Sequence, residues 1–126
     1  MADRKRILVA DDDPDLIDLL KMDLGNEGYD VLVAVNGKEA LQTAMAEKLD
    51  LILLDVMMPY IDGYHVAYEV TNKLGAAAPP IVLMTSRDTA REKGIAIMSG
   101  AAEVLQKPFE MAFLHQKVAQ ILEKKK

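Results

Sequence analysis

The chain has 126 residues, of which 51% are hydrophobic, so we expect one domain over residues 1–126 and no separate output domain. Its net charge of -5 argues against direct nucleic-acid binding, which requires a basic surface. Cysteine is absent, which excludes disulfides and thiolate chemistry, and no apolar run could span a bilayer; we therefore expect a cytoplasmic protein without membrane insertion.

Short apolar runs alternate along the chain with longer segments of helical periodicity. This alternation is typical of an α/β fold, in which helices cover both faces of a parallel sheet. We predict strands near residues 6–10, 30–35, 50–54, 80–85 and 103–106. We predict helices near residues 14–25, 37–48, 63–74, 88–98 and 109–123. Asn36 is a start signal, and Gly25, Gly75 and Gly100 are placed as C-terminal stops.

Functional side chains stand at the carboxyl ends of four predicted strands. Asp11 and Asp12 follow the first strand, Asp55 follows the third, Thr85 ends the fourth and Lys107 follows the fifth. Open α/β sheets bind ligands outside the carboxyl ends of their strands. For Asp12 and Asp55 to share a cation, the first and third strands must be neighbours. This requirement places the second strand outside the first and predicts a doubly wound sheet of order 2-1-3-4-5.

The acidic residues predict a bound cation. Two unit negative charges about 4 Å apart repel each other by roughly 4 kcal/mol at an effective dielectric constant of about 20. Capping of the first helix at Pro14 explains Asp13, but it does not explain Asp11 and Asp12 at the end of a buried strand. Mg²⁺ prefers hard oxygen ligands and often combines one or two carboxylates with phosphate oxygens. We therefore predict a magnesium and phosphoryl site.

These residues closely resemble the receiver domain of bacterial two-component response regulators, which has the flavodoxin-like, CheY-like (βα)5 fold. The resemblance covers essentially the whole chain, in four segments: Ile7 to Pro14, Leu53 to Pro59 with Asp62-Gly63, Met84 to Ser86, and Lys107 to Phe109. The family has the strand order 2-1-3-4-5 as well, so the resemblance implies the order that a shared cation requires.

The resemblance also implies the ligands of the predicted site. Asp55 is implied to be the phosphoacceptor. Asp12 and Asp55 are implied to bind Mg²⁺ directly, together with the backbone carbonyl of Met57, and Asp11 is implied to contribute through a water molecule. Lys107 is expected to contact the phosphoryl group, and Thr85 is expected to donate its hydroxyl to that group after transfer.

The implied function is signalling. A sensor histidine kinase or a histidine phosphotransfer protein would donate the phosphoryl group, and an unidentified downstream protein would bind the changed surface. We expect a stand-alone receiver that is not an enzyme beyond self-catalysed phosphotransfer to Asp55 and slow autodephosphorylation. We also expect that the bulky side chains of Met57 and Arg87, which flank the path of hydrolytic water, slow the loss of the phosphoryl group.

One position departs from the family pattern. Val104 stands three residues before Lys107, where many receivers carry Tyr or Phe as a rotating switch. Thr85 and Val104 are the expected switch positions, and without a ring two alternatives stay open. Output could run through backbone shifts of segment 86–98, or the domain could respond little. The Lys107-Pro108 peptide matches a family position with a cis bond, but the low frequency of cis X-Pro favours trans.

Three alternative functions use the same residues. An EF-hand calcium loop is excluded, because Leu16 and Met22 replace its required glycine and bidentate glutamate. A phosphatase resembling the haloacid dehalogenase superfamily would carry a second Asp as general acid two residues after Asp55, where Met57 stands. A receiver-like interaction module that is never phosphorylated is the third alternative, and the intact acidic set argues against it.

Overall fold

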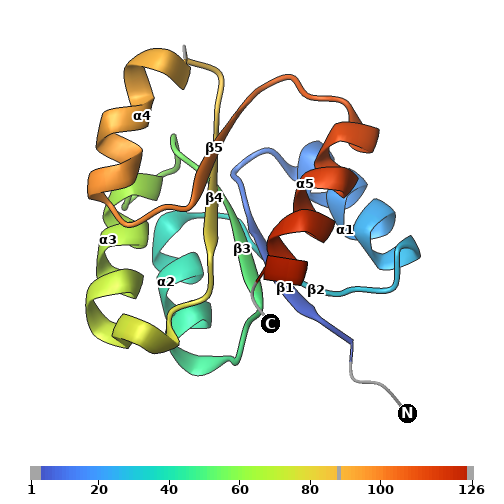
Figure 1. Cartoon of the computed structure of the whole chain (residues 1–126), viewed down its shortest axis with the longest axis horizontal. Helices are drawn as coiled ribbons and strands as arrows, with labels where there is room; N and C mark the ends of the chain where they lie inside the picture. Colours follow the sequence, from blue (N-terminus) through green and yellow to red (C-terminus); the bar gives the residue numbers. More distant parts are fainter. Residues whose placement is uncertain (1–3, 88, 125–126) are drawn as a thin grey trace.

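A five-stranded parallel sheet forms the centre of the molecule in the computed structural model, which describes residues 4–87 and 89–124 (Figure 1). The strands are β1 (Arg6–Ala10), β2 (Asp30–Ala34), β3 (Leu51–Asp55), β4 (Ile81–Thr85) and β5 (Glu103–Gln106). All pairs are parallel, and the order is β2-β1-β3-β4-β5. The predicted α/β fold and strand order are confirmed.

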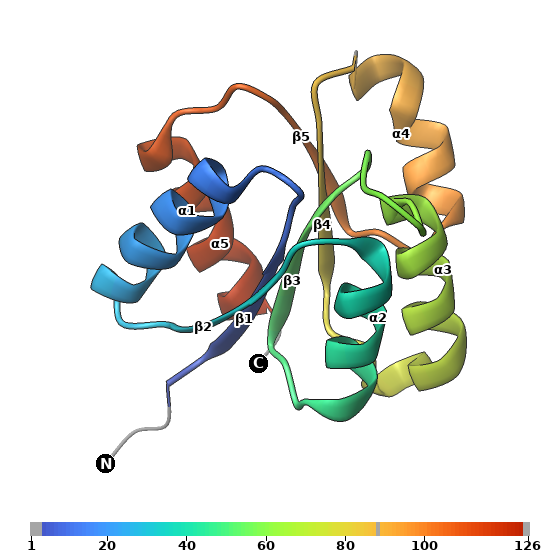
Figure 2. The same cartoon turned by 180° about the vertical axis from the view of Figure 1, so that it is seen from behind.

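Helices cover both faces of the sheet. They are α1 (Pro14–Asn26), α2 (Gly37–Ala46), α3 (Gly63–Leu74), α4 (Thr89–Met98) and α5 (Met111–Lys124), with a short 3-10 turn at Gly75–Ala77. Figure 1 and the reverse view in Figure 2 place α1 and α5 on one face and α2, α3 and α4 on the other. None of the helices in the described residues combines the length and apolar character needed to cross a membrane.

The central strands are buried on both sides, which explains their unbroken apolar sequences. Successive side chains of a strand point to opposite faces. Along β3, Ile52 and Leu54 join the core under α2, α3 and α4, whereas Leu51 and Leu53 join the core under α1 and α5. All five residues of β3 are buried, including Asp55 at its end. The carboxylate of Asp55 therefore lies at the carboxyl end of the sheet, directly after four apolar residues of β3.

The glycine stop signals are confirmed at two positions out of three. Gly75 caps α3 with a φ of 54°, and Gly100 follows α4 with a φ of 93°. The prediction for Gly25 is wrong, because α1 continues to Asn26. The chain reverses instead at Gly28, which has a φ of 96°. Positive φ is the property that makes glycine necessary at such a position.

The boundaries of α2 and α5 also differ from the prediction. Asn36 caps α2 as expected, since its side chain accepts a hydrogen bond from the N–H of Glu39 at 2.8 Å. However, α2 ends at Ala46 rather than 48, because the next residue already has extended backbone. Helix α5 begins at Met111 rather than 109. Residue 88, the predicted first residue of the fourth helix, lies outside the described residues.

Candidate functional site

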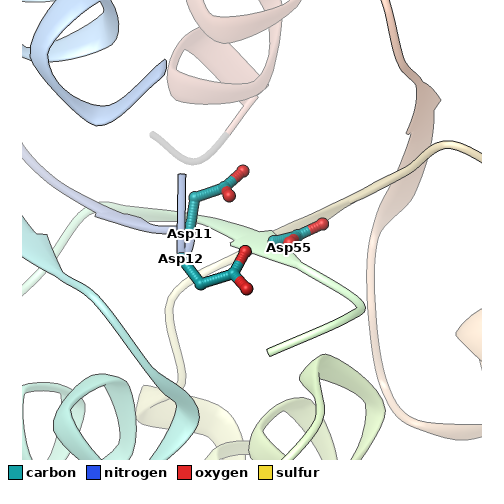
Figure 3. Close-up of side chains that lie close together, drawn as sticks. All are labelled: Asp11, Asp12 and Asp55. Carbon is teal, nitrogen blue, oxygen red and sulfur yellow. The ribbon is translucent and has the colours of Figure 1, made fainter. Parts of the chain in front are cut away.

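The carboxyl ends of β1 and β3 bring three acidic side chains together. Residue pairing places Ala10 opposite Leu54, so Asp11, Asp12 and Asp55 follow at the same edge of the sheet. One carboxylate oxygen from each acidic residue lies within 4.8 Å of the other two. Figure 3 shows the three side chains close together. Asp11 and Asp55 are buried, whereas Asp12 is exposed. The cluster predicted from the strand ends is therefore assembled.

The turn after β1 holds Asp11 in place. Its backbone N–H donates to the carbonyl of Ala34 at 3.2 Å, and its Oδ1 accepts from the N–H of Asp13 at 3.0 Å. Asp13 is in turn the N-cap of α1, because its side chain accepts from the N–H groups of Asp15 and Leu16. The start of the helix and the acidic cluster are thus connected by consecutive hydrogen bonds.

Lys107 reaches the cluster from the end of β5. Its Nζ lies 2.6 Å from Oδ2 of Asp11 and 3.2 Å from Oδ1 of Asp55. Its backbone N–H donates to the carbonyl of Thr85 at 2.7 Å, which extends the pairing of β4 and β5 by one residue. The peptide bond to Pro108 is cis, so the expectation of a trans bond is wrong. The tertiary amide of an X-Pro bond makes this isomer accessible.

Burial and charge shift the pKa of both Asp55 and Lys107. Burial is the largest cause at Asp55, the charge of Asp11 adds to it and Lys107 opposes it, and the pKa rises from 3.8 to about 6. Burial lowers the pKa of Lys107, but its hydrogen bond and charge interactions with Asp11 and Asp55 outweigh that effect and raise the pKa. One ammonium cannot neutralise three carboxylates, which favours a divalent cation.

Thr85 places a buried hydroxyl at the end of β4, beside the acidic cluster. Strand pairing puts Asp55 opposite Met84, so Thr85 is the next residue along the neighbouring strand. The Oγ atom accepts a hydrogen bond from the backbone N–H of Arg87 at 3.0 Å. A hydroxyl that accepts in this way still has its own proton to donate.

The amino-acid sequence matches the response regulator receiver domain over residues 7–119. The chain belongs to this family. The receiver is 38% identical over 118 residues to the alkaline phosphatase synthesis transcriptional regulatory protein PhoP of Bacillus subtilis, covering 94% of this chain and 48% of PhoP. It is also 38% identical over 113 residues to the uncharacterized transcriptional regulatory protein YrkP of the same organism, covering 90% and 47%. The receiver thus spans about half the length of these curated relatives.

Solved structures agree with this assignment. The receiver domain of the Francisella response regulator 1452 superposes with a TM-score of 0.90 at 30% identity, covering 98% of this chain and 100% of that one. The response regulator TrrA of Thermotoga maritima, solved in complex with Mg²⁺ and BeF, superposes with a TM-score of 0.83 at 38% identity, covering 93% and 98%. The CheY-like fold of this two-component signalling receiver is therefore shown.

Gly63 lets the start of α3 approach the end of β3 in the receiver. A Cβ atom at this position would lie 2.4 Å from the backbone carbonyl oxygen of Asp55. The N–H of Gly63 also donates to the carbonyl of Val56 at 2.8 Å. No side chain fits here without moving the backbone that carries the candidate phosphoacceptor.

We expect Gly63→Ala to lower the free energy of unfolding by about 2 kcal/mol, as overpacking against rigid backbone does. Urea denaturation measures the change. Gly94→Ala in α4 is the control, because a Cβ there meets nothing within 4 Å. The control should gain about 0.5–1 kcal/mol from higher helix propensity. Equal stability of Gly63→Ala and the wild type would show that the close approach is not restrictive.

Met57 and Arg87 were expected beside the receiver site, but their contacts and the involvement of Glu92 and Tyr64 were not predicted from the sequence. A guanidinium nitrogen of Arg87 lies 3.3 Å from Sδ of Met57, and another lies 3.7 Å from Oε1 of Glu92. The hydroxyl of Tyr64 donates to the carboxylate of Glu92, which is buried. Burial and this hydrogen bond raise the pKa of Tyr64 to about 12. The two bulky residues Met57 and Arg87 thus contact each other and are connected to α3 and α4.

Val104 occupies β5 without a ring to rotate. It is partly buried, packs against the core under α2, α3 and α4, and lines a groove together with Ala96 and Ile97 of α4. Its position beside α4 is consistent with either alternative for the switch, so its role stays a prediction.

Proposed function

We propose that Asp55 accepts a phosphoryl group from a phosphohistidine in a magnesium-dependent reaction, and that the receiver signals through a changed protein-binding surface. The observation that carries this proposal is the position of Lys107, whose Nζ lies between Asp11 and Asp55 in a cluster that also contains Asp12. Family membership supports the same chemistry.

The residues present fit a magnesium ion. The cluster offers hard carboxylate oxygens within 4.8 Å of one another, and they carry more negative charge than Lys107 neutralises. Asp12 and Asp55 would hold the ion directly with the backbone carbonyl of Met57, and Asp11 would act through water. When bound, Mg²⁺ supplies charge neutralisation for phosphoryl oxygens. The TrrA complex with Mg²⁺ and BeF shows such an ion in a relative.

Three side chains of the receiver have separate roles in the phosphoryl transfer. An oxygen of Asp55 forms a bond to phosphorus as the bond from phosphorus to the donor imidazole breaks, and the electron pair of that bond stays on the imidazole nitrogen. Because its pKa is about 6, Asp55 is mostly ionised at neutral pH and can act as the nucleophile. The ammonium of Lys107 holds the transferred oxygens, and the Thr85 hydroxyl then donates to them.

The switch is proposed to run from Thr85 to α4. The Oγ atom of Thr85 already accepts a hydrogen bond from the N–H of Arg87, and Arg87 contacts Glu92 on α4. If a phosphoryl group draws Thr85 inward, Arg87 and the start of α4 would therefore shift with it. Val104 would follow by repacking against α4 rather than by rotating a ring.

Intact-mass measurement after incubation with acetyl phosphate and Mg²⁺ tests the proposal. We expect the wild type to gain one phosphoryl group and Asp55→Asn to gain none. Omission of Mg²⁺ should abolish the gain in the wild type. A phosphoryl adduct on Asp55→Asn would contradict the assignment of the acceptor, and a wild type that stays unmodified would support the interaction module that is never phosphorylated.

Multiple turnover of a phosphate monoester would instead support the phosphatase alternative. Met57 argues against it, because no carboxylic acid stands at that position to protonate an alcohol leaving group. We propose that the receiver is no enzyme beyond its own phosphorylation and dephosphorylation.

The partners and context are proposed from the family. A histidine kinase or histidine phosphotransfer protein is the donor, an unidentified protein is the target, and the cytoplasm is the compartment. PhoP and YrkP are about twice as long as this chain, so the stand-alone organisation stays a proposal. The mass of the protein recovered from its own cells tests this organisation.

We expect the double variant Met57→Ala/Arg87→Ala to lose its phosphoryl group severalfold faster than the wild type. The two side chains contact each other beside the site, so their removal opens a path for water. Decay of the phosphorylated form after removal of the donor measures the rate. Met98→Ala, which truncates an exposed methionine on α4, is the control and should decay like the wild type. An unchanged half-life in the double variant would contradict the shielding role.

A further inference from the structure

Tyr60 has a strained backbone in the loop between β3 and α3. It is the one non-glycine residue with a positive φ, 72°, in the part of the chain that the structure describes. The N–H of Ile61 donates to the carbonyl of Pro59 at 2.9 Å, which closes a three-residue γ-turn around Tyr60. A γ-turn with positive φ at its centre is rare and strained, and a bulky residue is an outlier there.

Contacts on both sides of Tyr60 hold the turn in place. The carbonyl of Pro59 also accepts from the N–H of Gly37 at 3.4 Å. Ile61 packs against the core, and its carbonyl lies where a Cβ at Gly37 would be, at 1.7 Å. Asp62 caps α3 by accepting from the N–H of His65 at 2.9 Å. Such strain persists only where the surroundings determine the conformation.

Among the described residues, the Tyr60 ring gains little packing that could offset this strain, since it lines only a shallow pocket with Ile61, Asp62 and His65. The residue is 84% exposed, the same exposure as Met98 on the outer face of α4. Glycine would adopt the same φ without steric cost. Interactions within the folded chain therefore do not explain why a tyrosine occupies this position.

The loop that carries Tyr60 lies beside the acidic cluster. The groove beside the acidic cluster is lined by Asp12, Met57, Pro59 and Asp62, so this loop forms one wall of the opening. Figure 2 shows the loop between β3 and α3 at the same end of the sheet as the start of α4. A protein that brings a phosphohistidine to Asp55 must cover this wall, whereas a small phosphodonor need not touch it.

We propose that Tyr60 is a docking anchor for the protein that donates the phosphoryl group to Asp55. This inference rests on the proposed function. A tyrosine ring supplies a large contact area and fixes few rotatable bonds, which is why tyrosine is common at interface hot spots. The γ-turn holds the ring outward before binding, so less conformational entropy is lost when the donor docks.

The experiment compares two kinds of phosphodonor on wild type, Tyr60→Ala and Tyr60→Gly. One donor is acetyl phosphate with Mg²⁺. The other is an autophosphorylated histidine kinase of the organism that encodes the chain, chosen as the one that labels the wild type fastest. With the kinase, both variants should lose about tenfold in kcat/KM, mostly through KM, because an aromatic anchor is truncated. With acetyl phosphate, all three should agree within about twofold.

A matched control and a stability measurement separate docking from folding. Tyr68→Ala removes another exposed ring, on α3, and should not change transfer from the kinase. Tyr60→Gly should melt a few degrees above Tyr60→Ala, because only glycine relieves the strain at positive φ. Equal melting temperatures would overturn the argument from strain.

The outcomes distinguish this inference from the proposed function. Unchanged transfer from the kinase overturns the anchor, and so does an equal loss with both donors, which would place the effect at the site itself. Labelling by acetyl phosphate, but by no histidine kinase and no histidine phosphotransfer protein of that organism, also overturns the anchor alone. Labelling by neither donor overturns the proposed function, and the inference with it.

Discussion

Replacing Lys107 by Met is expected to lower the free energy of unfolding by about 3 kcal/mol at about pH 7.5 without Mg²⁺. The ammonium lies 2.6 Å from Asp11, which is fully buried, and 3.2 Å from Asp55. Its removal leaves two close carboxylates in a poorly solvated place, while Met retains most of the aliphatic volume. Urea denaturation in the presence of a chelator measures the loss.

The loss in Lys107→Met should shrink as Asp55 becomes protonated below about pH 6, and Mg²⁺ should restore part of the stability. The same variant should be labelled by acetyl phosphate about a hundredfold more slowly, because one group that stabilises the transferred charge is missing. Lys117→Met is the control, since Lys117 forms a partly exposed ion pair with Glu103 at 2.8 Å. It should cost at most about 1 kcal/mol. Equal losses in the two variants would contradict a special role for Lys107.

Replacing Asp55 by Asn is expected to stabilise the magnesium-free protein by about 2 kcal/mol at about pH 7.5. The folded-state pKa of about 6 exceeds the ordinary 3.8, so ionisation of Asp55 disfavours the folded state. The difference of about two pKa units corresponds to about 3 kcal/mol at about 1.4 kcal/mol per unit, a net value that already includes the attraction of Lys107. Screening by water at the open end of the site lowers the expected gain to about 2 kcal/mol.

The stabilising effect of Asp55→Asn is expected to depend on pH. A carboxyl group whose pKa is raised by folding destabilises the protein fully above about pH 6 and hardly at all below about pH 4. The advantage of the variant should therefore appear between these values as the pH rises, as measured by urea denaturation with a chelator. Asp18→Asn, at an exposed position on α1, should change stability by less than about 0.5 kcal/mol throughout. If Asp55→Asn were less stable than the wild type at about pH 7.5, ionisation of Asp55 would not destabilise the folded protein.

Mg²⁺ should reverse the order of stability of these two proteins. The wild type offers the full acidic cluster and gains free energy from the bound ion, whereas Asp55→Asn lacks one of its ligands. Titration of the melting temperature with Mg²⁺ measures both responses in one experiment.

Much of the site could be predicted because strand direction follows from the sequence pattern. Once β1 and β3 are parallel neighbours, Asp11, Asp12 and Asp55 have to lie at one edge of the sheet. Lys107 follows for the same reason from β5. These predictions needed only the apolar runs and the residues that directly follow them.

Other features depend on tertiary packing and could not be predicted. The contact between Tyr64 and Glu92 joins residues 28 positions apart, and it forms because α3 and α4 lie on the same face of the sheet. The extension of α1 past Gly25 reflects the fact that a glycine can continue a helix when the reversal occurs three residues later at Gly28. The positive φ of Tyr60 contradicts the local preference of the residue and arises from the contacts of its neighbours.

The hydrogen bond between Asp11 and Lys107 joins residues that are 96 positions apart in the chain. During synthesis, Asp11 at the end of β1 leaves the ribosome long before Lys107 does. A nascent polypeptide therefore carries its acidic trio without the ammonium until almost all of the domain has emerged. A chain that stops before Lys107 should therefore lack the ammonium that contacts Asp11 and Asp55, and we expect it to accept phosphoryl groups poorly.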